Sequence, residues 1–270
     1  MYKSDYLNTK TTNYYPLQPG FEINMDHYIQ LKRGRDPISQ DIILFYQFKT
    51  NKDLVNSIFV LPDGCIDLLF CCNPMKSSAY IYGTVLKGQQ IIFEENSEYF
   101  GVRYMPDQGH YIMKELIDQR VPLNDVISSA SSIVDEIGGA QSFQERTELL
   151  VNLVNNLTLK INHIPDIVRY SIKVICSAKG NFAIHQLAQE TGYSNRYLRK
   201  KFEEFIGLSP KFFSEIIRFQ KSLSMVIDPT NYDYWDIISE NGYYDQSHLI
   251  SEFKKFSNLT PAKLKHCLFK

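Results

Sequence analysis

The 270-residue sequence lacks the long apolar runs that a membrane-spanning helix requires. Its longest such runs, residues 42–46 and 68–72, are far shorter than the roughly 20 apolar residues needed to cross a bilayer. The first eight residues are too polar to form the apolar core of a secretion signal. We therefore expect a cytoplasmic protein with no membrane among its partners.

Cysteine is scarce, and its spacing is not that of a structural site. The five cysteines are odd in number and include no Cys-x-x-Cys pair, so neither a disulfide framework nor a zinc ribbon is predicted. His27 and His110 have no second ligand at metal-binding spacing. No paired nucleophile and base and no glycine-rich phosphate loop marks an active site. The sequence thus predicts no metal, no cofactor and no enzyme.

What the sequence does contain is apolar material and an uneven distribution of charge. Hydrophobic residues make up 44% and aromatic residues 13%, which is enough for folded cores. The net charge is −1, but residues 1–165 carry 14 Lys and Arg against 19 Asp and Glu, a net of −5. Residues 166–270 carry 15 against 11, a net of +4. Since positive charge favours contact with a polyanion, only the second part is expected to approach nucleic acid.

The first hundred residues show a β pattern. Segments rich in aromatic and β-branched residues alternate with turn-forming residues, which is typical of strands in a sandwich or barrel. The expected strands cover residues 42–48, 57–61, 66–71, 79–86, 90–94 and 99–104. The sequence therefore predicts an α+β protein that begins with a cupin-like β-barrel or sandwich.

After Pro106 the pattern turns helical. An apolar stripe at helical spacing extends from Phe143 to Leu157, whereas residues 128–132 and 138–139 have the composition of loops. We place a domain boundary before residue 165. Residues 1–164 are expected to form a β-rich sensing or dimerisation domain with trailing helices, and residues 165–270 an all-α domain.

The strongest signal is an internal repeat within residues 184–264. Gly192-Tyr193 returns as Gly242-Tyr243, and Leu208-Ser209-Pro210 returns as Leu259-Thr260-Pro261. Each copy has the pattern of a short helix, a turn at the glycine and a second helix. This is a helix-turn-helix motif, present twice.

The caps and the connection between the copies support this interpretation. Ser194 and Asp245 stand where they can cap the second helix of each copy. Residues 210–227 predict one connecting helix, about 27 Å long at about 1.5 Å per residue. Helices held about 34 Å apart enter successive major grooves on one side of a duplex. A connector of this length is compatible with such a spacing.

The polar faces of the two second helices are the candidate DNA-binding surface. In the first copy Arg196, Arg199 and Lys200 share one face, and arginine can bind guanine O6 and N7 through two hydrogen bonds. In the second copy the candidates are Gln246, Ser247, Lys254 and Lys255. The alternative is that these are merely solvated helix faces, partly balanced by glutamates. The repeated turn chemistry favours DNA binding.

Residues 166–266 resemble the DNA-binding domain of AraC-type transcription regulators, which contains two helix-turn-helix motifs. The resemblance rests on Leu187-Ala188, Gly192-Tyr193-Ser194, Tyr197-Leu198, Phe202, Gly207-Leu208-Ser209-Pro210, Arg218, Ile237, Gly242-Tyr243, Asp245-Gln246-Ser247-His248-Leu249, Phe253-Lys254-Lys255 and Leu259-Thr260-Pro261. It implies that the positions of Arg196, Arg199, Lys200, Gln246 and Ser247 contact bases. Where the family commonly has an arginine this chain has Ser251, and serine cannot replace a long cationic fork. The second motif is therefore expected to contribute less.

The first domain more loosely resembles the sensor halves of some of these regulators. The matching residues are Leu61-Pro62-Asp63-Gly64, Asp67-Leu68, Gly101-Val102-Arg103-Tyr104 and Pro106. Arg103 lies within an apolar stretch, so it is a candidate anchor for an acidic effector in a pocket shared with Tyr46, Tyr82 and Tyr104. The alternative is that Arg103 pairs with a nearby carboxylate, Asp63 or Asp67.

These patterns favour a sequence-specific transcription regulator whose partners are double-stranded DNA and a small-molecule effector. If the protein activates transcription, RNA polymerase is a further expected partner. One alternative is a regulator controlled only by homodimerisation or by a partner protein, with the stripe at 143–157 as the interface. Another is a barrel enzyme tethered to DNA.

Overall fold

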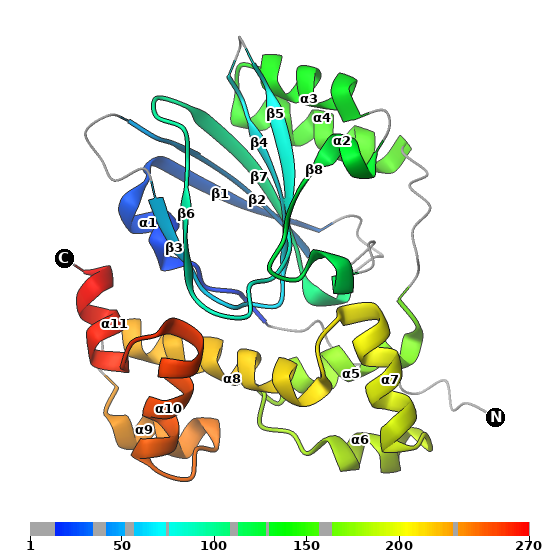
Figure 1. The fold of residues 1–270 in the computed structure, drawn as a ribbon, viewed down its shortest axis with the longest axis vertical. Coiled ribbons are helices and arrows are strands. Elements are labelled where there is room, and N and C mark those ends of the chain that lie inside the picture. The colour runs from blue at the N-terminus through cyan, green and yellow to red at the C-terminus, as the bar shows by residue number, and fades with distance from the viewer. Residues whose placement is uncertain are drawn as a thin grey trace.

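The computed structural model describes residues 14–34, 42–51, 57–73, 76–108, 113–127, 130–156, 164–228 and 232–269. Figure 1 shows a curved β-sheet standing on a layer of helices. We call the described residues 14–156 the sheet domain and the described residues 164–269 the helical domain. The predicted α+β class, with strands first and helices last, is confirmed.

A six-stranded antiparallel sheet dominates the sheet domain, in the order β1-β2-β7-β4-β5-β8. Its strands are β1 (Asp26–Gly34), β2 (Ile42–Lys49), β4 (Ile66–Cys71), β5 (Ser78–Tyr82), β7 (Glu98–Tyr104) and β8 (Arg120–Pro122). A second sheet pairs β3 (Ser57–Val60) with β6 (Gln89–Ile92) and stands across the concave side of the first (Figure 1). Each of the six expected strands overlaps an observed one, and β1 and β8 are additional.

Short helical segments precede the first strand and separate β7 from β8. They are α1 (Pro19–Asn24), η2 (Pro106–Gln108) and η3 (Met113–Leu116). Each of them contacts another element, and η3 lies against a helix of the helical domain. These segments therefore take part in joining the two domains.

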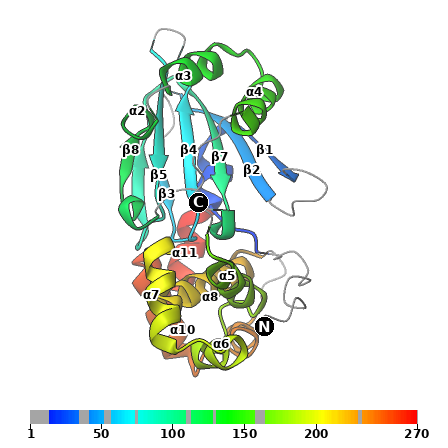
Figure 2. The same ribbon diagram turned by 90° about the vertical axis from the view of Figure 1, so that its right-hand side faces the viewer.

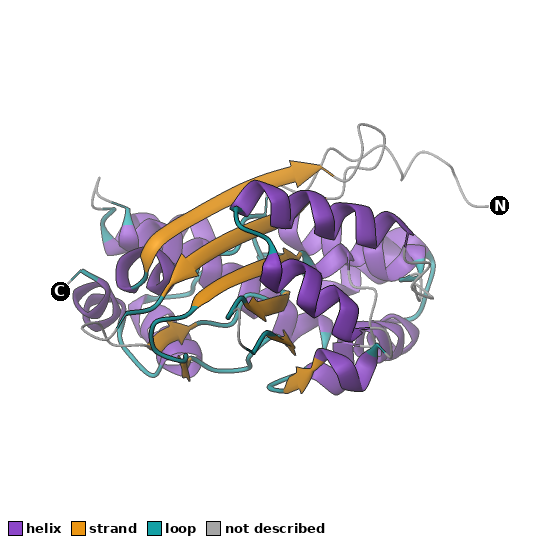
Figure 3. Ribbon diagram, turned by 90° about the horizontal axis from the view of Figure 1, so that it is seen from above, coloured by secondary structure: helices purple, strands orange, loops and turns teal. Residues whose placement is uncertain are grey.

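Three helices, α2 (Leu123–Val126), α3 (Ala130–Gly139) and α4 (Phe143–Asn156), follow the last strand, and α3 and α4 lie along one side of the sheet in Figure 3. The expected loops at 128–132 and 138–139 are wrong from residue 130 onward, because α3 runs through both segments; residues 128–129 lie outside the described part. Ile133, Val134 and Ile137 of α3 are buried at helical spacing. Their burial stabilises a helix that the serines and glycines alone would not favour.

The apolar stripe of α4 packs on its own sheet over the residues whose side chains are described. The ring of Phe143 contacts that of Phe100 in β7, with centroids 6.0 Å apart, and Leu150 is buried. Leu157, the last residue of the expected stripe, lies outside the described residues.

The helical domain contains two pairs of short helices around one long helix. Its elements are α5 (Asp166–Ser177), α6 (Ile184–Thr191), α7 (Asn195–Ile206), α8 (Pro210–Ile227), α9 (Tyr234–Asn241), α10 (Gln246–Ser257) and α11 (Pro261–Leu268). The long helix α8 has the bounds predicted from the sequence and begins at a proline, whose fixed φ suits a first helical turn. The two helix-turn-helix units are α6–α7 and α9–α10.

The two domains share one apolar core. A single cluster of buried side chains includes Phe100 and Ile133 of the sheet domain and Phe213 and Phe253 of the helical domain. Figure 2 shows the helical layer directly beneath the sheet. Within the described residues, none of the helices combines the length and the apolar character needed to traverse a bilayer.

Candidate functional site

The first helix-turn-helix unit has the turn chemistry that the sequence predicts. Gly192 ends α6 with a φ of 73°, in the left-handed region. Ser194 then caps α7, and its hydroxyl accepts a hydrogen bond from the backbone N–H of Tyr197 at 3.2 Å. Leu198 and Phe202 face the core. The opposite side of α7 is therefore left to solvent.

The basic residues of α7 lie on this exposed side. Arg196, Arg199 and Lys200 are all exposed, and together they line a shallow hollow beside the helix. Arg199 Nε donates a 2.7 Å hydrogen bond to Glu203 one turn later. Because an exposed pair of this kind contributes at most about 1 kcal/mol, Arg199 can exchange Glu203 for another anion at little cost. Lys114 of η3, which the sequence did not indicate, lines the same hollow.

The second unit repeats this arrangement with less charge. Gly242 ends α9 with a φ of 70°, and Asp245 caps α10 by accepting a 2.8 Å hydrogen bond from the backbone N–H of His248. Gln246 and Ser247, in the first turn of α10, are exposed. This turn is therefore accessible to a partner but carries no cation.

The two lysines near the end of α10 differ in their surroundings. Lys254 is exposed. The Lys255 ammonium contacts the Glu215 carboxylate of α8 and lies 4.6 Å from the centre of the Phe212 ring. Lys255 is thus held against the connecting helix, while Lys254 faces solvent.

A buried polar network fixes α10 on α8. The Arg218 guanidinium binds both oxygens of Glu252, a carboxylate on the inner face of α10 that is only 5% exposed. The Tyr243 hydroxyl donates to Glu252 at 2.7 Å and lies 3.0 Å from the Ser222 hydroxyl. Burial raises the pKa of Tyr243, so its hydroxyl remains a proton donor. The network determines the orientation of α10 relative to the connecting helix.

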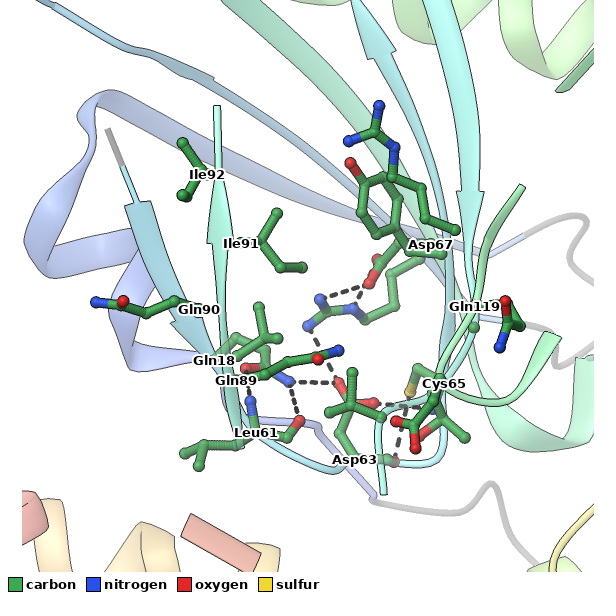
Figure 4. A pocket seen from close by; sticks show the side chains of 18 residues that line it. Gln18, Leu61, Asp63, Cys65, Asp67, Gln89, Gln90, Ile91, Ile92 and Gln119 are labelled. Carbon is green, nitrogen blue, oxygen red and sulfur yellow. Dashed lines mark hydrogen bonds and ion pairs between the residues drawn. The ribbon is translucent and has the colours of Figure 1, made fainter. Parts of the chain in front are cut away.

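A cavity of about 410 Å³ lies in the sheet domain, between the large sheet and the β3–β6 sheet. Figure 4 shows its lining side chains, among them Gln18, Asp63, Asp67, Gln89, Gln119 and Ile91. Four residues of its wall form one row across the strands, because Arg103 of β7 is paired with Asp67 of β4, Asp67 with Tyr82 of β5, and Tyr82 with Arg120 of β8. The wall is therefore polar and carries both signs of charge.

Arg103 is bound by two carboxylates of this wall. Its Nε and Nη2 each donate a 2.8 Å hydrogen bond to Asp67, and Nη1 lies 3.5 Å from Asp63 (Figure 4). Burial alone would lower the pKa of Arg103, but the two carboxylates outweigh it and raise this pKa. Burial raises the pKa of Asp67, an effect that Arg103 opposes. The alternative in which Arg103 pairs with a nearby carboxylate is the one that the structure contains.

The four expected pocket residues do not all meet. Arg103 and Tyr82 line the cavity. Tyr46 does not line the cavity, but it lies on the same face of the sheet, with its ring against Gly101 and its centre 5.7 Å from the Arg103 guanidinium. Tyr104 packs against the large core on the other face of the sheet. Adjacent residues of a strand point to opposite faces, which separates Tyr104 from Arg103. Arg120, Gln18 and Gln119 complete the cavity, and no local sequence pattern distinguishes them.

Comparison with known proteins finds similarity in two separate parts of the chain. A sequence family described as a helix-turn-helix domain matches residues 187–266, and one described as a domain of unknown function (DUF6597) matches residues 35–122. No curated protein sequence matches the chain.

Solved structures of one protein are similar to the chain at low identity. A 1.65 Å resolution structure of ToxT from Vibrio cholerae is 14% identical, covers 84% of this chain and 98% of its own, and has a TM-score of 0.47. Unsaturated fatty acid bound wild-type ToxT from Vibrio cholerae strain SCE256 is 18% identical, covers 84% of this chain and 95% of its own, and has a TM-score of 0.42.

Proposed function

We propose that the chain is an AraC-type transcription regulator, because residues 187–266 match a helix-turn-helix family and contain two such motifs. In this proposal the protein binds DNA and has no enzymatic activity of its own. In our proposal α7 and α10 enter two adjacent major grooves of one duplex, and we call them the reading helices. The observation that carries the proposal is that each reading helix buries its apolar face and exposes its polar one.

The exposed residues divide into two roles. We propose that Arg196, Arg199, Lys200, Gln246 and Ser247 contact base edges, because these side chains suit the donors and acceptors of the major groove. Lys254 and Lys255 are proposed to contact phosphates, which position a protein without specifying sequence. Lys255 must leave Glu215 to do so. With Ser251 on the outward side of α10, most of the sequence discrimination is assigned to α7.

Selection of bound sequences from a random DNA pool, with the full-length protein, tests this proposal and yields the operator. On the selected site, Arg199→Ala is expected to cost about 1–3 kcal/mol of binding free energy and to relax specificity at one position. Lys254→Ala is expected to weaken binding evenly across sequences and to reduce the salt dependence by about one ion. Lys76→Ala, an exposed change in the sheet domain, is the control. Unchanged affinity and specificity in the double variant Arg196→Ala/Arg199→Ala would contradict the proposal.

For control of this activity we propose a small molecule in the sheet-domain cavity. Its volume of about 410 Å³ suits a ligand of modest size. Because Asp63 and Asp67 already compensate the charge of Arg103, that residue has little attraction left for an acidic ligand. The amides of Gln89 and Gln119 and the guanidinium of Arg120 offer hydrogen bonds. An uncharged, hydrogen-bonding ligand fits this lining.

Thermal unfolding in the presence of neutral polar metabolites and of carboxylates separates the two ligand classes. We expect neutral compounds to raise the Tm and to change the affinity for the selected operator. Gln119→Leu should reduce both effects, and Lys76→Ala neither. If carboxylates alone raised the Tm, the neutral-ligand proposal would be wrong.

The organisation of the chain follows from these roles. We propose that residues 1–164 form the sensing or dimerisation domain and residues 165–270 the DNA-binding domain. Control by homodimerisation or by a partner protein is the alternative. Light scattering of the full-length protein with and without operator DNA distinguishes a dimer from a monomer.

A further inference from the structure

The C-terminal end of α7 rests on the sheet domain with no space between the two backbones. Gly207, which ends the helix, has a φ of 77°. A Cβ atom at this position would lie 2.6 Å from Cα of Lys114 and 2.4 Å from Cδ1 of Ile117. Only glycine fits such a close approach, so η3 and the residues after it pack directly against the end of the first reading helix.

The C-terminal end of α10 also contacts the sheet domain, through a different loop. The backbone N–H of Gly88 donates a 2.6 Å hydrogen bond to the carbonyl of Phe256, the penultimate residue of α10. This carbonyl has no partner within the helix, because the last carbonyls of a helix lack one. The loop before β6 thus satisfies an end group of the second reading helix.

The two contacting segments of the sheet domain are bonded to each other. The backbone N–H of Asp118 donates to the carbonyl of Thr84 at 3.1 Å, and the Asp118 carboxylate accepts from the backbone N–H of Leu86 at 2.8 Å. The backbone N–H of Gly83 donates to the carbonyl of Gln119 at 3.1 Å. We call residues 83–88 and 114–119 the bridge. It connects the end of α7 to the end of α10 through the sheet domain, independently of α8.

The connecting helix is anchored separately. Gln220 of α8 is only 1% exposed, and its side chain donates to the carbonyl of Pro62 at 2.8 Å and accepts from the backbone N–H of Leu17 at 2.8 Å. The sheet domain therefore contacts the end of α7, the middle of α8 and the end of α10, in addition to the contacts of η2 with α5 and of α1 with α11. The Glu252 network orients α10 on α8, and the contacts at the ends of α7 and α10 add constraints on the two reading helices that α8 alone does not supply.

We propose that the bridge sets the distance and angle between the reading helices, and so determines how many base pairs separate the two subsites in the operator. This inference rests on the proposed reading of DNA by α7 and α10. Successive major grooves lie about 34 Å apart along the duplex, so two rigidly spaced helices accept one subsite separation and reject its neighbours. The sheet domain thereby makes binding depend on the number of base pairs between the two subsites, although it does not itself contact the DNA.

Two variants loosen the bridge at different places. Gly207→Ala places a methyl group where η3 leaves no room. Its matched control is Gly192→Ala, which has nearly the same backbone strain, with a φ of 73°, but no atom within 4 Å of the added carbon. Asp118→Gly removes the carboxylate that binds the loop at Leu86, and glycine tolerates the φ of 53° at this exposed position.

The experiment uses the full-length protein and a DNA pool in which the two selected subsites are separated by different numbers of base pairs. The wild type and Gly192→Ala are expected to prefer one separation by about tenfold over separations one base pair longer or shorter, equivalent to about 1.4 kcal/mol. Gly207→Ala and Asp118→Gly are expected to reduce this preference to about threefold or less. Affinity for a single subsite should stay within about twofold in all four proteins.

The outcomes separate this inference from the function on which it rests. A wild type that selects no sequence would remove the proposed function. A wild type that selects two subsites at one separation, with the same preference in Asp118→Gly and Gly207→Ala, would overturn the inference and leave the function intact. Circular dichroism verifies that each variant is folded, and Asp118→Gly decides the question if Gly207→Ala does not fold.

Discussion

At the scale of single residues, burial separates the charged side chains into two groups. Arg103, Arg146 and Arg218 are enclosed and bind carboxylates in the sheet domain or between helices. Arg196 and Lys200 are exposed. Since a buried charge is tolerated only when it is paired, the enclosed arginines have structural roles, and the exposed ones remain for an external anion.

The buried thiols and phenols predict a loss of stability in alkaline solution. Burial raises the pKa of Cys72 to about 12, and it also raises the pKa values of Cys65, Cys176 and Tyr14. At a pH above the ordinary thiol pKa, which is near 9, the folded chain keeps protons that the unfolded chain releases. The free energy of unfolding therefore falls as the pH rises above about 9.

Urea unfolding at pH 8 and pH 10 measures this effect. Each fully shifted group contributes up to about 1.4 kcal/mol per pH unit. Equal or greater stability at the higher pH would contradict the burial of these groups.

At the scale of helices, the contrast between a buried and an exposed ion pair shows what holds the reading helices. Glu252 attaches α10 to Arg218 of α8 from the inside, whereas Glu203 pairs with Arg199 on the outer surface of α7. The Glu252–Arg218 pair determines the direction of α10 on α8. The Glu203–Arg199 pair only compensates the charge of Arg199 on the surface.

Replacing these two glutamates in parallel tests the contrast. Glu252→Leu leaves Arg218 buried without its partner and should lower the free energy of unfolding by about 3–5 kcal/mol. Glu203→Leu should change it by less than about 1 kcal/mol. Urea unfolding of the two variants gives the comparison, and similar values for both would show that the network around Glu252 does not hold α10.

Sequence reasoning identifies an element when its signal is local. The repeated glycines, the caps Ser194 and Asp245, and the bounds of α8 could all be predicted, because each depends on neighbours within a few residues. The helix α3 was missed because its serines and glycines suggest a loop, and only packing on the sheet favours the helix.

The candidate sites divide in the same way. The exposed basic side chains of α7 follow from helical periodicity, so the sequence predicts them. The pairing of Arg103 was one of two alternatives that only the strand register resolves. Other features depend on contacts between distant parts of the chain, and no local pattern predicts them. They are the places of Lys114 and Arg120 in the two sites and the Gly88–Phe256 hydrogen bond.

At the scale of the whole molecule, the continuous apolar core makes the two domains one thermodynamic unit. Phe213 of α8 is fully buried, and its ring lies so close to Gly64 of the sheet domain that a Cβ there would be 2.8 Å from it. Separating the domains would expose this ring together with the buried amide of Gln220. Both effects oppose independent unfolding.

Calorimetry of the full-length protein is therefore expected to show one unfolding transition. Gln220→Leu leaves the carbonyl of Pro62 and the N–H of Leu17 without this partner, and should lower the Tm. Two well-separated transitions in the wild type would mean that the shared core does not couple the domains.

The hydrogen bond between Gly88 and Phe256 joins two backbone groups, so substitutions of side chains on α10 do not remove it. Its atoms are the same whatever side chains α10 presents to solvent. Exchanging Gln246 or Ser247 for other residues changes the chemistry offered to a base pair while the helix remains seated at its far end. Base preference thus depends on exposed side chains, whereas the position of the helix depends on a backbone hydrogen bond. A protein designer can change the base preference without moving the helix.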